Sequence, residues 1–394
     1  MHKRRIFKIN KISNLGFIKG LIPKNSFVKN VGLLAGGQAI AQLILVASSP
    51  ILTRLYQPED FGVLGAFTSL LNIFIAGSSL RYDLAITVTN DEKDAVNLVK
   101  LSFIYLLLTN ILFILFLLLF WDLNSERFSI SYSSYIFITL PIGAFIKGSY
   151  TILNFWSVRK SQFKLITKTK INQSLICTFS QMSGYLISGY VLIISQVIGE
   201  LYSSVKLFKN FASKNLLNKL DFIDFVNLSK KYKKYPLYSL WANLTNIASL
   251  QIAPLLIVAI FNAKAAGFYL LAYRTVGLPM NLIGSATGQV FLANAPNLKR
   301  KDELKNLILN VYKNLVKISL IPFLILLIMG PDIFKLVFGN EWIEAGKFAS
   351  AMSPWLFLVF ISSPLSNLFT ILDRQRMSLI FCIGLFLARV STLL

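Results

Sequence analysis

Histidine and cysteine are almost absent from this chain of 394 residues. The only histidine is His2, and the two cysteines, Cys177 and Cys382, both lie within apolar stretches. The lack of histidine excludes histidine-dependent catalytic triads, histidine metal clusters and histidine proton relays. Two cysteines inside apolar segments predict no disulfide framework. We therefore expect a protein that is not an enzyme, with no catalytic residues, no metal site and no cofactor.

Charge is also scarce, and acidic charge most of all. Charged residues make up 14% of the chain, whereas a soluble domain carries about 25%. The chain has 40 basic and 17 acidic residues, a net charge of +23, and 55% hydrophobic residues. Such an excess could indicate a nucleic-acid partner, but the basic residues occur in short blocks between apolar segments, which is typical of membrane orientation. The composition predicts an integral membrane protein that binds no nucleic acid.

Long apolar segments recur from Val31 to Leu394, and a helix needs about 20 apolar residues to cross a bilayer. The region 165–206 would be about 63 Å long as one helix, so we expect two helices with a turn near Gly189. The chain ends in apolar sequence, which suggests that a twelfth helix is missing; the alternative is a true eleven-helix protein. The expected spans are 31–53, 61–80, 97–120, 133–154, 168–187, 190–206, 237–261, 267–292, 308–330, 348–371 and 377–394.

The segments that join these spans alternate between rich and poor in basic residues. One alternate set holds 30 of the Lys and Arg residues, and the opposite set holds 5. Because basic loops stay on the cytoplasmic side, we expect a multi-pass membrane protein with a cytoplasmic N-terminus. The predicted division is a basic tail (1–30), a six-helix bundle (31–206), a basic cytoplasmic linker (207–236) and an incomplete second bundle (237–394).

Similar features recur in the two halves in the same order. Pro50 precedes Gly62 by twelve residues, and Pro254 precedes Gly267 by thirteen. The sequence TILN at 151–154 is echoed by TILD at 370–373, and basic residues follow both. These matches predict two parallel six-helix repeats, an architecture of transporters whose substrate site lies between the halves.

Charged residues inside the predicted spans are candidates for a binding site. A charge at the bilayer centre costs about 2.5–3.5 kcal/mol, so it indicates function by default. Arg274, Lys147 and Arg81 could line a cavity for an anion such as a pyrophosphate, which Arg pairs bidentately. Structural roles remain open for each of them: carbonyl capping or an ion pair for Arg274, snorkelling for Lys147 and a pair with Asp83 for Arg81.

Amide side chains suggest a second kind of ligand group. Gln38 and Gln42 share a face of the first span, Asn243 and Asn246 share a face of the seventh, and Gln42 matches Asn246 at an offset of 204 residues. Such amides suit hydroxyl-rich ligands such as sugars, or they join helices by hydrogen bonds. Glu200 is the only acidic residue within a predicted span, so coupling to an ion would have to use Glu200, Asp83 or the membrane potential.

Six segments carry a resemblance to a known family: LTRLYQPEDFG at 52–62, LRYDLAI at 80–86, AYR at 272–274, GLP at 277–279, FGNEW at 338–342 and DRQR at 373–376. They resemble the bacterial polysaccharide flippases of the inner membrane, a family of the superfamily that also holds the multidrug and toxic compound extrusion transporters. The resemblance extends from about residue 30 to residue 394, and Arg81 and Arg274 match family motif positions.

The resemblance implies two bundles in a V that open alternately to either side of the membrane. It implies translocation of undecaprenyl-pyrophosphate-linked oligosaccharide repeat units for O-antigen, capsule or exopolysaccharide, with a polysaccharide polymerase and a chain-length regulator as expected partners. The implied cavity is cationic and lined by Arg81 and Arg274; Lys147, Gln38, Gln42 and Asn246 are added here from their position within spans. A missing twelfth helix, as suggested above, would be a departure from the family pattern.

Two other functions fit the same composition. A cation-coupled multidrug extruder would share the fold, but the absence of acidic residues from the first, seventh and eighth spans weakens that alternative. A membrane polymerase or ligase would be expected to carry a large outer loop with catalytic residues. The longest expected outer connection is only about 17 residues, from Pro331 to Lys347, which argues against an enzyme. The sequence does not name the sugar, the energy source or the oligomeric state.

Overall fold

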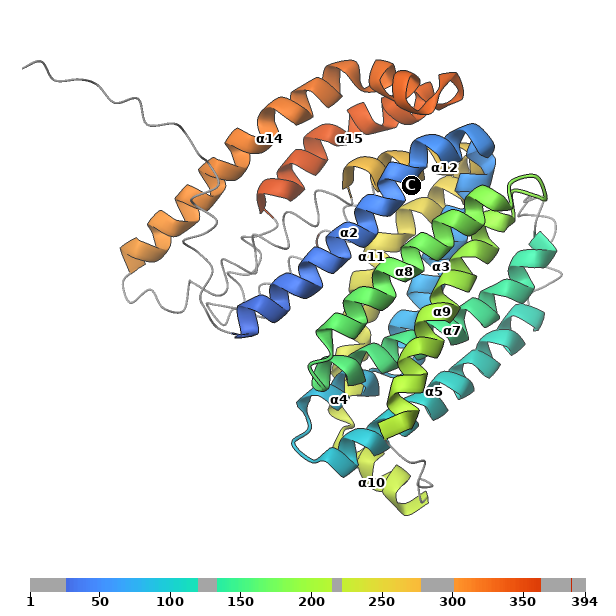
Figure 1. The fold of residues 1–394 in the computed structure, drawn as a ribbon, viewed down its shortest axis with the longest axis vertical. Helices are drawn as coiled ribbons and strands as arrows, with labels where there is room; N and C mark the ends of the chain where they lie inside the picture. The colour runs from blue at the N-terminus through green and yellow to red at the C-terminus, as the bar shows by residue number, and fades with distance from the viewer. Residues whose placement is uncertain (1–25, 120–132, 215–221, 278–300, 363–383, 385–394) are drawn as a thin grey trace, which may run out of the picture.

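The structure is a computed structural model that describes residues 26–119, 133–214, 222–277, 301–362 and 384. Within these ranges all regular secondary structure is helical (Figure 1). The elements are α2 (Ser26–Leu55), α3 (Pro58–Ser78), α4 (Tyr82–Val88), α5 (Glu92–Leu119), α7 (Ser133–Arg159), α8 (Phe163–Ser183), α9 (Val191–Lys214), α10 (Phe222–Lys231), η1 (Tyr235–Ser239), α11 (Leu240–Ile260), α12 (Ala263–Ala272), η2 (Tyr273–Gly277), α14 (Lys301–Phe338), η4 (Asn340–Trp342) and α15 (Ile343–Ser362).

Ten of the eleven expected spans coincide with a described helix over all or part of their length. Seven helices in the described ranges are long and apolar enough to cross a membrane, and α7 and α8 stand where the fourth and fifth spans were expected. The predicted return near Gly189 is present between α8 and α9. The last expected span (377–394) apart from residue 384, the later parts of two others, and the TILD and DRQR segments lie outside the described residues.

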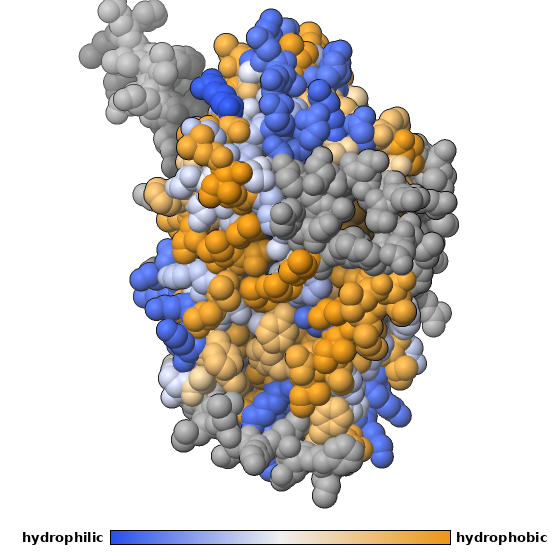
Figure 2. Space-filling model, turned by 90° about the vertical axis from the view of Figure 1, so that its right-hand side faces the viewer, coloured by the Kyte–Doolittle hydropathy of each residue, from blue (hydrophilic) through white to orange (hydrophobic). Residues whose placement is uncertain are grey.

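The surface of the helices is apolar where lipid would contact it. Leu107, Leu112 and Leu119 of α5 are 51%, 64% and 79% exposed, and Leu115 and Phe116 are about half exposed. Figure 2 shows hydrophobic residues spread over much of one face of the molecule. A soluble protein rarely exposes so large an apolar area, whereas a bilayer buries it at no cost. This surface agrees with a multi-pass membrane protein.

Two helices from distant parts of the sequence begin at capped turns. The Asp60 carboxylate accepts a hydrogen bond from the Gln57 backbone N–H at 3.0 Å, and Pro58 occupies the first turn of α3, where its missing N–H is not needed. The Asn262 side chain accepts a hydrogen bond from the Ala265 backbone N–H at 2.8 Å and so begins α12. These caps set the register in which α3 and α12 meet.

Gly62 of α3 and Gly267 of α12 lie where the two helices are closest. A Cβ added to Gly62 would lie 1.7 Å from the carbonyl oxygen of Ala263, and one added to Gly267 would lie 1.8 Å from that of Pro58. Ala263 and Pro58 are the first residues of α12 and α3, so each glycine, four residues into its helix, meets the start of the other. The contact is therefore reciprocal, and only glycine permits it.

An aromatic cluster covers the glycine pair. Trp342, which is 1% exposed, packs edge-on against Phe61 and Phe268, with ring centroids 5.0 and 6.0 Å apart. Its indole N–H donates a hydrogen bond to the Thr53 carbonyl oxygen at 2.9 Å. We call Phe61, Gly62, Gly267, Phe268 and Trp342 the glycine seam. It joins α3, from early in the chain, to α12 and the α14–α15 turn from late in the chain.

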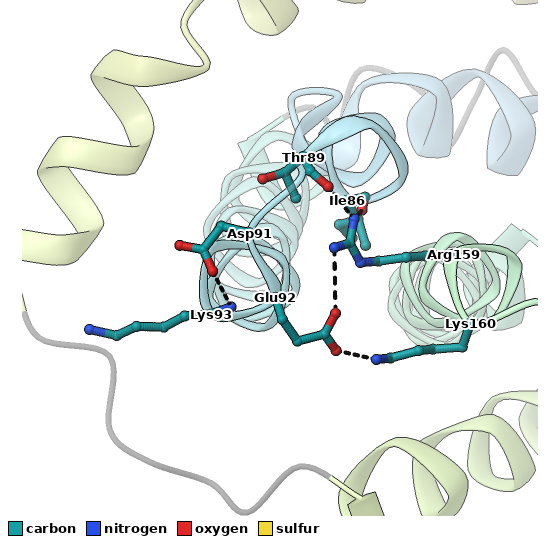
Figure 3. A network of polar contacts seen from close by, with 7 residues as sticks. All are labelled: Ile86, Thr89, Asp91, Glu92, Lys93, Arg159 and Lys160. Carbon is teal, nitrogen blue, oxygen red and sulfur yellow. Dashed lines mark hydrogen bonds and ion pairs between the residues drawn. The ribbon is translucent and has the colours of Figure 1, made fainter.

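Basic residues gather at the opposite end of the bundle, where α4 and α7 end and α5 begins (Figure 3). The Arg159 guanidinium donates to the carbonyl oxygens of Ile86, at 3.0 Å, and Thr89, and it contacts Glu92 at 3.4 Å. Lys160 also pairs with Glu92. Arg159 therefore satisfies carbonyls at the C-terminus of α4, a favourable place for a cation.

The expected cytoplasmic linker packs onto this basic end. Helix α9 continues to Lys214, eight residues past the expected end of the sixth span, and α10 follows. Leu228 of α10 is buried, Phe225 stacks on Tyr105 of α5 at 5.8 Å, and the Tyr82 hydroxyl donates to the Ser229 carbonyl oxygen at 3.2 Å. The apolar side of α10 therefore covers α4 and α5.

Candidate functional site

A polar cavity lies between helices from the early and late parts of the chain. Its volume is about 500 Å³, within the range of about 300–1,000 Å³ typical of ligand sites. Residues of α2, α3, α7, α8 and α9 line one side, and residues of α11, α12 and η2 line the other. Among the lining side chains are seven amides: Gln38, Gln42, Asn72, Gln173, Gln181, Gln196 and Gln251.

Lys147 of α7 points into this cavity from the early half of the chain. Its ammonium group donates a hydrogen bond to the Asn72 side-chain oxygen at 2.7 Å and lies 3.5 Å from Glu200 Oε1. Glu200 is 3% exposed, and its Oε2 has no hydrogen-bond partner within the described part of the chain. The Lys147 side chain is only 24% exposed, so snorkelling does not account for it. Lys147 and Glu200 form an ion pair in the cavity wall.

Lys170 is a further cation in the cavity, and the sequence did not single it out as a candidate. Helix α8 begins at Phe163, five residues before the expected span, so Lys170 lies about two turns inside the helix. Its ammonium group lies 3.3 Å from the Gln173 side-chain oxygen and 5.4 Å from the centre of the Tyr150 ring. The polar residues Asn172 and Gln173 beside it were the available signal that this helix faces a cavity.

Arg274 approaches the cavity from the late half of the chain. It is 8% exposed and lies in η2, a wide helical turn of the kind often found at functional sites. Its guanidinium donates a hydrogen bond to the Leu45 carbonyl oxygen of α2 at 3.0 Å. The Ser48 and Ser49 hydroxyls donate to the same oxygen at 2.9 Å. Carbonyl capping, one of the structural roles considered for this arginine, is therefore present, and the residue also lines the cavity.

Arg81 and Asp83 lie at the turn between α3 and α4 and do not line this cavity. Arg81 has a left-handed backbone with φ of 64°, a strained conformation for a residue with a side chain. Asp83 is 3% exposed, and its carboxylate accepts a hydrogen bond from the Leu84 backbone N–H at 3.0 Å. Burial raises the pKa of Asp83, and the charge of Arg81 opposes that shift.

Only some of the amides that were expected to face a ligand line the cavity. Gln38 and Gln42 of α2 line the cavity, and Gln42 Nε2 is buried without a partner among the described residues. Asn246 of α11 is exposed and does not line the cavity. Its neighbour Asn243 instead donates a hydrogen bond to the Ala76 carbonyl oxygen of α3 at 2.9 Å, so it joins α11 to α3. The structure therefore brings together Gln38, Gln42, Lys147, Glu200 and Arg274.

The cavity carries more positive than negative charge. Of the described residues that line it, Lys147, Lys170 and Arg274 are cationic, and Glu200 is anionic. The described residues contain no group of three or more His, Cys, Asp or Glu that could hold a metal ion. Cations beside amides can bind an anion and hydrogen-bond hydroxyl groups. The arrangement suits binding of a polar anionic ligand at the level of the membrane.

Fold and cavity together define a multi-pass membrane transporter, and comparison with known proteins agrees. The inward-facing conformation of a multidrug resistance MATE family transporter of the MOP superfamily superposes with a TM-score of 0.67 at 18% identity, covering 87% of this chain and 83% of that one. A MATE transporter in the bent conformation superposes with a TM-score of 0.54 at 17% identity, covering 90% and 87%. At such identities the likeness concerns the fold.

The sequence profile of the family described as "Polysaccharide biosynthesis protein" matches residues 51–347. The chain belongs to this polysaccharide biosynthesis family. The predicted all-helical transporter fold is also confirmed. No curated protein matches the chain. Membership in a transporter-type family agrees with the expectation of a protein that is not an enzyme.

Proposed function

We propose that this protein moves undecaprenyl-pyrophosphate-linked oligosaccharide repeat units across the bacterial inner membrane for O-antigen, capsule or exopolysaccharide synthesis. One observation carries the proposal: among the described residues that line the cavity, Lys147, Lys170 and Arg274 are cationic and Glu200 alone is acidic. Two of these cations come from one side and Arg274 from the other, so a pyrophosphate between them would contact both halves. Desolvated cations hold phosphate oxygens strongly, and Arg does so bidentately.

The distribution of basic residues supports an orientation of the protein in the membrane. The positive-inside rule assigns the Arg159–Lys160 end and the N-terminus to the cytoplasm, so the glycine seam would lie on the periplasmic side. With that seam closed, the described conformation would be accessible from the cytoplasm, and the similar transporter of higher TM-score is an inward-facing one. We propose that the bundles 31–206 and 237–394 alternate between this arrangement and one in which the seam has parted, by alternating access.

The candidate residues take different roles in this proposal. Arg274, Lys147 and Lys170 would hold the pyrophosphate, and Gln38 and Gln42 would hydrogen-bond sugar hydroxyls, while the lipid tail stays in the bilayer. Arg81 and Asn246 have no place in the cavity of this conformation, so their contact with substrate stays a prediction. A polysaccharide polymerase and a chain-length regulator remain the proposed partners on the receiving side.

A cation-coupled multidrug extruder is the second candidate, and two observations favour it. The similar structures are MATE transporters, and Glu200 is a buried carboxylate within the cavity, with one oxygen unpaired among the described residues. A buried carboxylate can carry a proton or a sodium ion, so coupling through Glu200 is open to either function. The excess of cations opposes extrusion of cationic drugs.

Reconstitution in liposomes separates the two functions. The assay would measure transfer between leaflets of a fluorescent short-chain prenyl-pyrophosphate oligosaccharide, and uptake of a cationic dye in the same vesicles. We expect transfer of the glycolipid, and its loss in Arg274→Ala, with no dye transport. Dye transport driven by an ion gradient, without glycolipid transfer, would establish the extruder instead.

A further inference from the structure

The two sides of the cavity differ in chemistry. Charged lining residues of the early half are Lys147 on α7, Lys170 on α8 and Glu200 on α9. On the late side, the described lining residues beyond Arg274 are uncharged, and they include the rings of Tyr269 and Tyr273. A ligand that spans the cavity would therefore meet charge on one side and aromatic rings on the other.

The two tyrosines form a regular aromatic surface. They are four residues apart, at the end of α12 and the start of η2, and so share one helical face. Their rings are parallel within 3°, with centroids 6.1 Å apart. Both rings are partly exposed, and both line the cavity. An offset pair of parallel rings next to a polar space presents aromatic surface to a ligand.

Helix α11 adds polar groups on the same side. Gln251 lines the cavity, as do Leu250 and Pro254. Pro254 has no N–H, so the Leu250 carbonyl loses the donor that a regular helix would supply. An amide and a carbonyl that lacks its helical donor therefore lie on the side that carries the two rings, where they can pair with hydroxyl groups.

We propose that Tyr269 and Tyr273 form a sugar-binding surface, on which a pyranose ring of the substrate lies. The C–H bonds on one face of a pyranose carry partial positive charge, and the face of a tyrosine ring is negative. Hydroxyl groups at the edge of the sugar then reach amides such as Gln251. This inference rests on the proposed function and deepens it, because it orients the substrate: the pyrophosphate lies among Lys147, Lys170 and Arg274, and the sugar lies on Tyr269 and Tyr273.

The test compares two probes on the purified full-length protein by calorimetric titration. One probe is a short-chain prenyl pyrophosphate, and the other is the same molecule carrying a disaccharide. Tyr269→Leu with Tyr273→Leu removes the rings, and Tyr269→Phe with Tyr273→Phe keeps them. We expect the leucine variant to bind the disaccharide probe about tenfold more weakly while its affinity for the bare pyrophosphate is unchanged. The phenylalanine variant should bind both probes nearly as the wild type does.

Other outcomes separate this inference from the function on which it rests. If the leucine variant binds the disaccharide probe as tightly as the wild type, or loses affinity equally for both probes, the sugar-binding surface is wrong and the proposed function stands. If the wild type binds neither probe, both fail. Saturation-transfer NMR on the disaccharide probe with wild-type protein needs no variant. Transfer to one face of a pyranose supports the proposal, and uniform or absent transfer contradicts it.

Discussion

The early and late parts of the chain face each other in two places, and the two are built in opposite ways. At the glycine seam, backbone meets backbone at Gly62 and Gly267, and the Trp342 indole N–H has its acceptor. In the cavity, polar atoms of Gln42 and Glu200 are buried without a partner among the described residues. One interface is closely packed and satisfied, whereas the other is open and partly unsatisfied.

The difference indicates which interface holds the conformation and which one awaits a ligand. Closely packed surfaces lose van der Waals contacts as soon as they separate. The seam therefore stabilises the closed arrangement. An unpaired buried polar atom costs about 1–3 kcal/mol, a cost that a ligand with matching groups would remove. Substrate binding would therefore act on the cavity, and release would require the seam to part.

The largest effect is expected from adding one methyl group to the seam. In Gly62→Ala the new Cβ would lie 1.7 Å from a backbone oxygen, which cannot rotate away as a side chain can. Helices α3 and α12 would have to separate, at a cost of about 3 kcal/mol or more, and transport should fall to background. Glycolipid transfer in liposomes and thermal unfolding of the purified protein would measure this.

Gly65→Ala is the matched control on the same helix. A Cβ there would meet only the Leu270 side chain, at 3.5 Å, which is ordinary van der Waals contact. This variant should transport and unfold as the wild type does, and Gly267→Ala should behave like Gly62→Ala. Equal behaviour of the Gly62 and Gly65 variants would show that the seam is not as close as described.

The second-largest effect is expected when the buried charge of Glu200 loses its partner in the cavity. Lys147→Met removes the ammonium group 3.5 Å from Glu200, which is 3% exposed, and should lower the free energy of unfolding by about 3 kcal/mol. Adding Glu200→Gln should restore most of that stability but not transport, because one of the cationic side chains that bind the substrate is still missing. Chemical denaturation of the wild type, the two single variants and the double variant completes a double-mutant cycle, which measures the energy of the Lys147–Glu200 interaction. If the two losses simply add, the pair makes no contribution.

Arg274→Ala should reduce transport about 100-fold while membrane insertion is unchanged. Its guanidinium is buried and adjoins the cavity, so it can hold a pyrophosphate without competition from water. Arg274→Lys should retain part of the activity, because a lysine keeps the charge but not the bidentate geometry. Arg54→Ala, at an exposed position outside the cavity, is the control. Normal transport by Arg274→Ala would remove this residue from the site.

Much of the fold was predictable from the sequence, because hydropathy and basic loops report directly on the bilayer. The paired glycines were also recognisable: Gly62 and Gly267 stood out by their spacing from Pro50 and Pro254. What the sequence could not show was that the two glycines contact each other's helices. That contact depends on how α3 and α12 cross, and it is a property of the three-dimensional arrangement.

The cavity residues were less predictable, for two physical reasons. Lys170 was not singled out because a helix that faces a polar cavity has low hydropathy, so its start at Phe163 is not visible in an apolar pattern. Asn246 was expected to face a ligand because it shares a helical face with Asn243. A small rotation of a helix about its axis decides which side chains face the cavity. Here Asn243 binds α3, and Asn246 is exposed. Packing of neighbouring helices, which no single segment encodes, decides both outcomes.

The smallest effect is expected at the Trp342 hydrogen bond. Trp342→Phe keeps an aromatic ring against Phe61 and Phe268 but removes the donor to the Thr53 carbonyl oxygen. The lost bond should cost about 1 kcal/mol, against about 3–5 kcal/mol for Trp342→Ala, which also empties the space between the rings. If closure of the seam depends on packing, the phenylalanine variant should transport nearly normally and the alanine variant should not. Equal loss in both variants, measured by glycolipid transfer and thermal unfolding, would show instead that the hydrogen bond and not the close packing holds the two halves together.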